Sequence, residues 1–516
     1  MLTIIGGGLA GCEAAWQAAS LDVPVVIHEM RPVRPTAVHK TDGLAELVCS
    51  NSFRGDKLDN AVGLLKEEMR RLGSLIMQSA DLSRVPAGAA LAVDRVRFSE
   101  TVTREIANHP RIRIVREEIA EVPTGLAGPV IVATGPLTSD ALSRNVAALV
   151  GGRHLYFYDA ISPIVLAESI DMSKVFRASR WGRSMRNPAP ALDEDQEPAR
   201  RSPEGDQEPA RRSPEGEGGS VPELSCGVDD GGGDYLNCPM DRDQYAEFHA
   251  AVVAAEKTAL HEFDDAKFFE GCLPIEVMAG RGVDTLRFGP MKPVGLVDPR
   301  TGREPYACVQ LRQDNLAGDH FSLVGFQTQM KWGEQARVLR LIPGLENAEF
   351  VRFGMIHRNT YINGPDVLRD TWQMKTRDDL FFAGQISGVE GYVESAASGL
   401  MAGRNAAALV LGQPMRVPPR TTALGALAHY VSHANPRHYQ PTNITFGIMA
   451  PIDDRALPRM RAADGRRMSR KETRKLALSE RALADLERWI EDGGTAGPLD
   501  RLMAGPFDGL SAGGPK

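Results

Sequence analysis

The chain has 516 residues, of which 42% are hydrophobic and 25% are charged, and its formal net charge is −7. This length allows two or three domains with buried cores, and the composition is that of an ordinary globular protein. The acidic balance excludes a globally basic surface, so any contact with nucleic acid must come from a local patch. No run of about eighteen apolar residues is present, which excludes a membrane-spanning helix.

The six cysteines have no C-x-x-C spacing. This pattern argues against a zinc site, and we predict no metal centre. The chain starts directly on a strand and leaves no room for a signal peptide. We therefore expect a cytoplasmic protein whose cysteines are thiols.

The first 31 residues predict a strand, a glycine turn, a helix and a second strand that ends on Glu29. The G-x-G-x-x-G spacing allows a tight turn, a close approach to a pyrophosphate and close packing of the helix. The N-terminus of the helix favours a bound phosphate, and the Glu29 carboxylate can accept a hydrogen bond from a ribose hydroxyl. An ordinary glycine turn would not need these two flanking strands. The predicted dinucleotide-binding residues are Gly6, Gly7, Gly8, Leu9, Ala10, Gly11, Glu29, Met30 and Arg31.

A polar loop follows and contains Cys49 in the sequence LVCSNSFR. A buried structural cysteine is the ordinary interpretation, since free cysteine is commonly buried. The small polar neighbours, Asn51 among them, and the position downstream of the dinucleotide turn favour a functional thiol. Apolar residues at helical spacing then predict one helix from Asn60 to about Gln78.

Residues 86–106 predict a short strand followed by a helix that begins near Asp94. Residues 111–122 predict alternating strands. Residues 128–135 predict a buried strand that ends in Ala-Thr-Gly at Gly135. Flavoproteins with two dinucleotide-binding domains commonly have such a glycine where the strand end approaches the flavin.

From about Gly152 the pattern changes to that of a mixed or antiparallel sheet. The sequence DQEPARRSPEG then occurs twice, at Asp195–Gly205 and Asp206–Gly216. Its prolines exclude a helix, and it has no large apolar residue to bury. We predict a disordered surface insertion over 184–233 that takes no part in chemistry.

A strand and a helix are predicted next, and then a loop-rich segment that contains Cys272. Loops rich in Gly, Pro and Arg commonly carry functional groups on a rigid scaffold. Glu270, Glu276 and Arg281 lie close to Cys272 in sequence. The residues alone leave open whether this cysteine is catalytic or part of the core.

Residues 378–407 repeat the pattern of the N-terminus, with a strand, a glycine-rich turn and a helix of small residues. Gly384, Gln385, Gly391 and Tyr392 are the predicted cofactor contacts here. The fold class is therefore α/β, with a Rossmann-like FAD-binding domain interrupted by a smaller α+β domain. We predict the FAD-binding domain over 1–150 and 354–413, the inserted domain over 151–353, and a helical basic region over 414–516 with a frayed end. The Arg- and Lys-rich run at 455–475 suits a solvated helix face and a phosphate-binding patch equally well.

Nine motifs occur in order along the chain: GGGLAGCEAAW, EMRP, AELVCSNSFR, DRVRFSE, ATGPLTS, FEGCLPIE, GPMKPVGL, HRNTYINGP and FAGQISGVEGYVESAASGL. Together they resemble the folate- and FAD-dependent tRNA (uracil-5-)-methyltransferases of the TrmFO type, relatives of the GidA/MnmG flavoproteins. The resemblance covers nearly the whole chain except the repeat insertion and the extreme C-terminus.

The resemblance implies bound FAD, NADPH or NADH as reductant, and 5,10-methylenetetrahydrofolate as carbon donor to C5 of a uridine in the T-loop of tRNA. It implies that Cys272 and Cys49 are the catalytic thiols, without assigning which is the nucleophile. Candidate substrate and folate contacts are Asn51, Arg281, His357, Arg358, Asn359 and Tyr361. The target base must leave the folded T-loop to react. No obligatory protein partner and no membrane contact are expected, and no segment indicates a second dinucleotide site.

Three other functions fit parts of the pattern. Wobble-uridine modification of the GidA/MnmG type would call for a longer helical C-terminal region. A small-molecule flavin oxidoreductase would need neither a basic tail nor two cysteine motifs. A flavin-binding RNA chaperone would bind RNA without methylating it.

Overall fold

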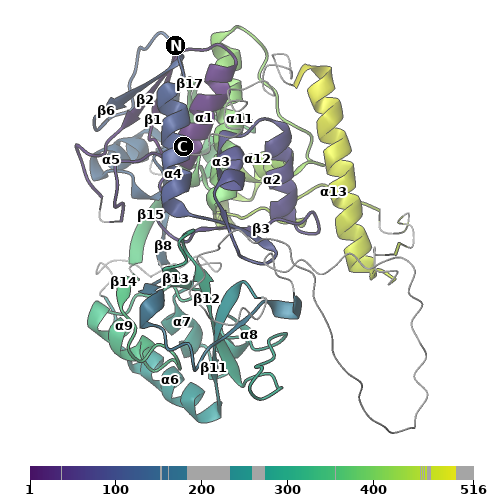
Figure 1. Ribbon diagram of the computed structural model, residues 1–516. Helices are drawn as coiled ribbons and strands as arrows, with labels where there is room; N and C mark the ends of the chain where they lie inside the picture. Colours follow the sequence, from purple (N-terminus) through teal and green to yellow (C-terminus); the bar gives the residue numbers. More distant parts are fainter. Residues whose placement is uncertain are drawn as a thin grey trace, which may run out of the picture.

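The computed structural model describes residues 1–36, 38–151, 154–160, 162–182, 233–258, 273–354, 356–453, 455, 457, 460–461 and 467–494. Within these ranges the chain forms two bodies with separate cores, one above the other in Figure 1. The repeat insertion lies outside the described residues except for Gly233, and Cys226 and Cys272 lie outside them too.

The upper body contains a six-stranded sheet in the order β16-β17-β7-β1-β2-β6. Its strands pair in parallel except β16, which is antiparallel to β17. Apolar β-branched runs form the central strands because both faces of the sheet are covered. The strands are β1 (Leu2–Ile5), β2 (Val25–Glu29), β6 (Ile112–Arg116), β7 (Val130–Val132), β16 (Gln373–Met374) and β17 (Arg377–Phe382). This sheet confirms the predicted α/β class, with a parallel sheet assembled from two distant parts of the chain.

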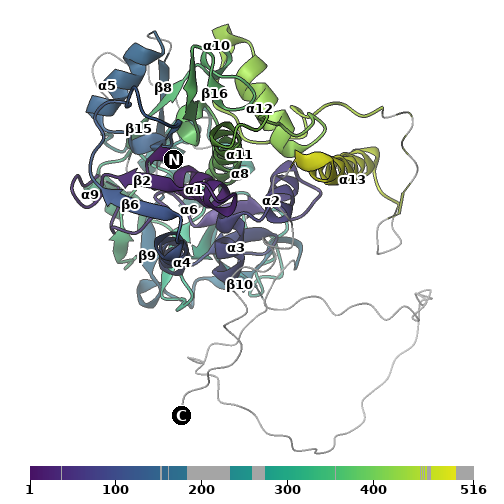
Figure 2. The same cartoon turned by 90° about the horizontal axis from the view of Figure 1, so that it is seen from above.

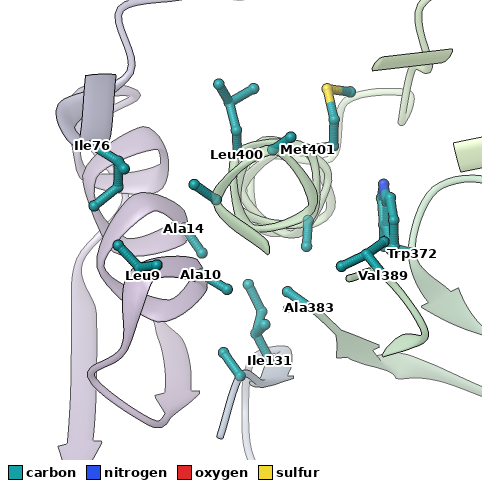
Figure 3. Close-up of a cluster of buried hydrophobic side chains, with 14 of the residues drawn as sticks. Leu9, Ala10, Ala14, Ile76, Ile131, Trp372, Ala383, Val389, Leu400 and Met401 are labelled. Carbon is teal, nitrogen blue, oxygen red and sulfur yellow. The ribbon is translucent and has the colours of Figure 1, made fainter. Parts of the chain in front are cut away.

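Two helices of small residues pack tightly on this sheet (Figure 3). They are α1 (Leu9–Ser20) and α11 (Tyr392–Val410). A Cβ on Gly399 would lie 2.2 Å from the Ala10 carbonyl oxygen, and one on Gly403 would lie 2.4 Å from that of Ala14. The two backbones are therefore in direct contact along one helical turn.

The single helix predicted from Asn60 to Gln78 is wrong, because the structure has two helices there. They are α2 (Ala61–Arg71) and α3 (Leu75–Leu82). Gly73, with a φ of 69°, ends the first helix, and Ser74 caps the second by accepting from the Met77 N–H. Both helices bury apolar residues on one core, so the continuous periodicity concealed the break.

The predicted strand and helix around Asp94 are confirmed. They are β5 (Ala90–Val93) and α4 (Arg95–Asn108), and the Asp94 carboxylate caps the helix by accepting from the Arg97 N–H. β5 pairs with β3 (Ser52–Gly55) and β4 (Arg84–Val85) in a small sheet beneath the cofactor-domain helices. Of the alternating strands predicted over 111–122, the structure has only β6.

The lower body contains a six-stranded antiparallel sheet in the order β10-β11-β12-β13-β9-β14. The described helices of this body pack against the sheet (Figure 1). The strands are β9 (Ile164–Leu166), β10 (Phe176–Ala178), β11 (Tyr235–Met240), β12 (Ala307–Gln313), β13 (His320–Leu323) and β14 (Phe350–Arg352). The helices are α6 (Arg242–Ala254), α7 (Ile275–Gly280), α8 (Thr285–Phe288) and α9 (Trp332–Leu339). The smaller α+β body predicted from the sequence is thus present.

Two strands, β8 (His154–Ala160) and β15 (Ile356–Ile362), lie where the chain passes between the two bodies. They pair antiparallel to each other, from His154 with Ile362 to Ala160 with Ile356. The outgoing and returning chains are therefore tied together at the boundary.

The C-terminal region adds α10 (Gly364–Val367), α12 (Ala423–His433) and α13 (Arg470–Trp489). In Figures 1 and 2, α13 lies on the outside of α2. Residues as far as Ile490 belong to the upper core, so this region packs on the cofactor domain. Among the described helices, none is long and apolar enough to cross a bilayer.

Candidate active site

A cavity of about 340 Å³ lies at the carboxyl ends of the parallel strands, where dinucleotides bind in such sheets. Its wall combines several segments of the upper body with Gln327 of the lower body. Thirteen of the residues predicted as cofactor or catalytic contacts line it: Gly6, Gly8, Leu9, Ala10, Glu29, Met30, Arg31, Cys49, Gly135, Gly384, Gln385, Gly391 and Tyr392.

The glycine turn after β1 shows why glycine is required. Gly6 has a φ of 107°, and a Cβ there would lie 2.6 Å from the Ala133 carbonyl oxygen. A Cβ on Gly11 would lie 1.9 Å from the Gly6 carbonyl oxygen, so Gly11 serves packing of α1 and does not line the cavity. Gly8 has open space where a Cβ would point, and it begins α1 without a side-chain cap. The α1 N-terminus is therefore available to an anion at the cavity.

Glu29 is fixed by both of its oxygens. Oε2 accepts from the Gly7 N–H at 2.8 Å, and Oε1 accepts from the Arg31 N–H and side-chain Nε at 3.0 and 2.8 Å. Burial by itself would raise the pKa of Glu29, but the Arg31 charge and these hydrogen bonds hold the pKa below its ordinary value. Glu29 is thus a buried carboxylate at the place expected for a ribose contact.

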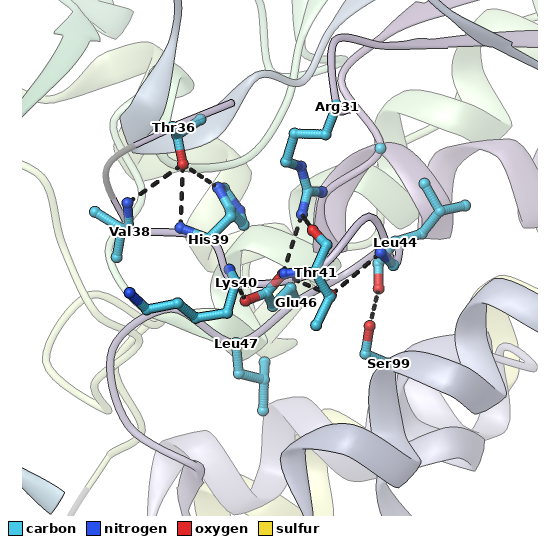
Figure 4. A network of polar contacts seen from close by, with 12 residues as sticks. Arg31, Thr36, Val38, His39, Lys40, Thr41, Leu44, Glu46, Leu47 and Ser99 are labelled. Atoms are coloured by element: carbon cyan, nitrogen blue, oxygen red, sulfur yellow. Dashed lines mark hydrogen bonds and ion pairs between the residues drawn. The ribbon is translucent and has the colours of Figure 1, made fainter. Parts of the chain in front are cut away.

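The segment after Arg31 folds back over the glycine turn (Figure 4). Arg31 Nη1 donates to the Thr41 carbonyl and to Glu46, and Glu46 accepts from the Lys40 and Thr41 N–H groups. Burial, and then the Arg31 charge, lower the pKa of His39 to about 4. In this wall of the cavity the His39 ring is therefore neutral, while Arg31 and Glu46 are held by an ion pair and by hydrogen bonds to the backbone.

The opposite wall comes from the ends of β7 and β17. Gly135 has a φ of 62° and starts a short 3₁₀ turn, Gly135–Leu137. Gly384 and Gly391 have φ values of 77° and 105°, and Gly391 begins α11 without a side-chain cap. Two uncapped helix N-termini thus reach one elongated cavity, which fits the pyrophosphate and ring portions of FAD.

Cys49 lies at the wall of this cavity, half-buried. Its N–H donates to the Tyr392 hydroxyl at 2.7 Å, and its carbonyl accepts from Arg95 and Arg352. Burial, and then Cys49 itself, raise the pKa of Tyr392, so this phenol stays neutral. The structure therefore brings Cys49 next to the predicted flavin contacts, although it is far from them in sequence.

Several predicted contacts do not line the cavity. The Asn51 amide is buried and donates to the carbonyls of Val93 and Gln313, which ties the Cys49 segment to the lower body. Tyr361 is buried against Tyr439, outside the cavity wall. Arg281 is exposed just after α7.

Two further groups of predicted contacts are placed only through their surroundings. His357, Arg358 and Asn359 belong to β15, which lies against the 3₁₀ turns Gly135–Leu137 and Gln385–Ser387. Cys272 is outside the described residues. The chain resumes at Leu273, and the Ile275 N–H donates to the carbonyl of Gln327, a cavity residue.

Sequence reasoning missed four polar residues at or beside this wall. Arg54 and Asn443 line the cavity, and Arg54 pairs with Glu394 of α11. Arg95 and Arg352 hold the Cys49 carbonyl. Arg95 and Arg54 had a signal, since they lie in the DRVRFSE and AELVCSNSFR motifs. Arg352 and Asn443 come from segments whose sequence indicated ordinary structure.

The parallel sheet, the glycine turn and the cavity at the strand ends define a dinucleotide-binding α/β protein with an inserted domain. The family model described as glucose inhibited division protein A matches residues 1–199 and 223–414. GidA of Aquifex aeolicus has a similar solved structure, with a TM-score of 0.63 and 17% identity over 97% of this chain and 75% of that one.

Closer relatives carry a specific name. The protein named methylenetetrahydrofolate–tRNA-(uracil-5-)-methyltransferase TrmFO of Geotalea uraniireducens is 52% identical over 95% of this chain and 98% of its own length. TrmFO of Enterococcus faecalis is 52% identical over 88% of this chain and 93% of its own. The chain belongs to the TrmFO family within the wider GidA group.

Proposed function

We propose that this protein is a folate- and FAD-dependent tRNA methyltransferase that forms 5-methyluridine in the T-loop. Relatives of that name at about half identity over nearly the full chain support it. The observation that carries the proposal in the structure is Cys49 at the wall of a cavity suited to a flavin dinucleotide. Because tRNA is the substrate, we place the enzyme in the cytoplasm.

The glycine turn, the α1 N-terminus and Glu29 would hold the pyrophosphate and adenosine ribose of FAD, and Gly384 and the start of α11 would hold its ring end. FAD would supply redox chemistry there, with NADPH or NADH as the reductant and 5,10-methylenetetrahydrofolate as the carbon donor. His357, Arg358 and Asn359 on β15 are the candidate contacts for the folate. Tyr361, buried at 5% exposure, serves packing of the adjoining tyrosine cluster.

The protein thiols act on the uracil. A thiolate adds to C6 and forms a C6–S bond, which makes C5 an enolate-like nucleophile toward the methylene carbon. After the new C5–C bond forms, a base removes the C5 proton and the bond between the methylene carbon and its carrier breaks, which leaves an exocyclic methylene on C5. A hydride that originates from NAD(P)H converts this methylene to the methyl group as the C6–S bond breaks, so the thiolate is regenerated. Cys272 and Cys49 divide the roles of nucleophile and assisting thiol.

Positive charge for the tRNA backbone is available on α13. Arg470 and Lys471 are exposed at its first turn, and Arg467 is exposed just before it. Phosphate contacts of this kind weaken steeply as salt rises. This surface is therefore a candidate for part of the tRNA-binding face.

The test is methylation of a tRNA transcript with NAD(P)H and folate that carries a labelled methylene carbon. Wild type is compared with Cys49→Ala, Cys272→Ala and the matched control Cys308→Ala, which removes a buried thiol of β12. We expect label in T-loop 5-methyluridine for wild type and control, and none for the other two while FAD stays bound.

Three results would contradict the proposal. Label at the wobble uridine would assign the protein to GidA-type modification. No label, with NAD(P)H oxidation intact and no tRNA binding, would make it a small-molecule flavin oxidoreductase. Binding of tRNA without label, even in wild type, would make it a non-enzymatic RNA-binding flavoprotein.

A further inference from the structure

Two arginines from different bodies converge on the carbonyl oxygen of Cys49. Arg95, the first residue of α4, donates to it from Nη2 at 3.0 Å, and Arg352, the last residue of β14, donates from Nη2 at 2.8 Å. The same guanidinium groups donate from Nη1 to the carbonyls of Leu47 at 2.8 Å and Val48 at 3.3 Å. Three successive carbonyls of the Cys49 segment are thus held by this pair.

The lower body also fixes Arg95 itself. Asp314, which follows β12, accepts from Arg95 Nε at 2.9 Å and from Nη2 at 3.2 Å. A third guanidinium, that of Arg312, donates to Asn51 at 2.8 Å two residues after Cys49. The position of the Cys49 segment therefore depends on contacts with the lower body.

The charges around Cys49 do not balance. Arg95, Arg312 and Arg352 provide three positive charges, and Asp314 provides one negative charge, which leaves two positive charges in excess. All three guanidinium groups act electrostatically on the Cys49 thiol, and the phenol that faces it, Tyr392, is neutral.

Arg352 carries a second sign of an unsatisfied charge. Its Nε is buried and has no hydrogen-bond partner among the described residues. Burial, and then Arg95, lower the pKa of Arg352 to about 10, so it remains a cation at neutral pH. An excess of buried positive charge is stabilised by an anion beside it, and the Cys49 thiol, with which all three arginines interact electrostatically, is a group able to become one.

We propose that Arg95 and Arg352 are positioning residues for Cys49, fixing its backbone at the cavity wall from two bodies and holding its thiol as the thiolate. The inference rests on the proposed role of Cys49 in methyl transfer. It assigns to the inserted domain a direct part in preparing a thiol that belongs to the cofactor domain.

The test measures the rate at which iodoacetamide alkylates Cys49 in the full-length holoenzyme between pH 4 and pH 10, resolved by mass spectrometry of the Cys49 peptide. Removing one positive charge in Arg352→Met raises the midpoint of the pH profile by about one unit, so alkylation at pH values below the wild-type midpoint becomes about tenfold slower. At pH 10 the two rates converge because the thiol is then ionised in both proteins. The control Arg337→Gln, an exposed arginine of α9 paired with Glu334, keeps the wild-type profile.

A purely structural clamp predicts the opposite sign, since a loosened segment exposes its thiol and is alkylated faster at every pH. An equal or lower midpoint in Arg352→Met, or equal or faster alkylation below the wild-type midpoint, therefore overturns the proposal. Arg352→Lys, which keeps the charge, stays within about threefold of wild type. If Arg352→Met yields no folded flavoprotein, Asp314→Asn is the deciding variant. It removes a negative charge, so the proposal predicts a lower midpoint of Cys49 alkylation. An unchanged or higher midpoint refutes the proposal. Alkylation needs no tRNA, so loss of the proposed methylation would leave this result readable by itself.

Discussion

The contact between α1 and α11 can be tested with a single added methyl group, in Gly399→Ala. The Cβ of the new alanine would lie 2.2 Å from the Ala10 carbonyl oxygen and 2.8 Å from the Ala10 Cα. Both neighbours are backbone atoms, so no side chain can rotate away. The two helices must separate, and Ala10 and Tyr392 lie in the cavity wall.

Two terms of opposite sign set the magnitude. Alanine is favoured over glycine inside a helix by about 1 kcal/mol. Overpacking of a close-packed interior costs about 1–3 kcal/mol and more where backbone must move. We expect a net loss of about 2 kcal/mol, which lowers Tm by about 4–8 °C. FAD is expected to dissociate more readily, because the start of α11 moves with the helix.

Thermal unfolding followed by circular dichroism measures the first effect, and flavin retained after desalting measures the second. The matched control is Gly333→Ala in α9, where a Cβ meets no atom within 4 Å. That variant keeps its flavin and is equally stable or more stable. A Gly399→Ala protein with unchanged Tm would show that the two backbones do not touch in solution.

Three further predictions concern buried charge. Burial raises the pKa of Glu68 to about 8 from 4.5, so the folded state favours the protonated acid, and the contribution of Glu68 to stability is fully present below pH 4.5 and is lost as pH rises toward 8. Urea unfolding should show wild type losing about 2 kcal/mol relative to Glu68→Gln between pH 6 and pH 8. Lys66→Met leaves the carbonyls of Phe53 and Gly55 in β3 without their buried donor, and we expect the free energy of unfolding to fall by about 2–4 kcal/mol in the same assay. Glu29→Gln removes a buried carboxylate from the cavity, and equilibrium dialysis should show FAD affinity reduced at least about tenfold; unchanged affinity would contradict its role.

Much of the cofactor side could be predicted because its requirements are local. A glycine at a positive φ, an uncapped helix start and an acid at a strand end are each properties of a few consecutive residues. Gly6, Glu29 and Gly391 were found in this way, and all of them line the cavity.

The missed features are those that depend on distant partners. Gly73 breaks a helix that apolar periodicity extended to Gln78, since both pieces bury the same core. Asn51 was expected to contact substrate, but its amide reaches carbonyls at Val93 and Gln313. Nothing in the sequence marked Arg352, because its partner, the Cys49 carbonyl, lies 303 residues earlier in the chain.

These long-range contacts explain why the cavity alone does not define the site. The upper body by itself would hold the dinucleotide, since its glycine turns and helix starts need nothing from the lower one. The Cys49 segment is different, because Asn51 and Arg95 both bind groups at the end of β12. The proposed role of Cys49 therefore depends on both bodies, because the contacts that fix its segment cross the domain boundary.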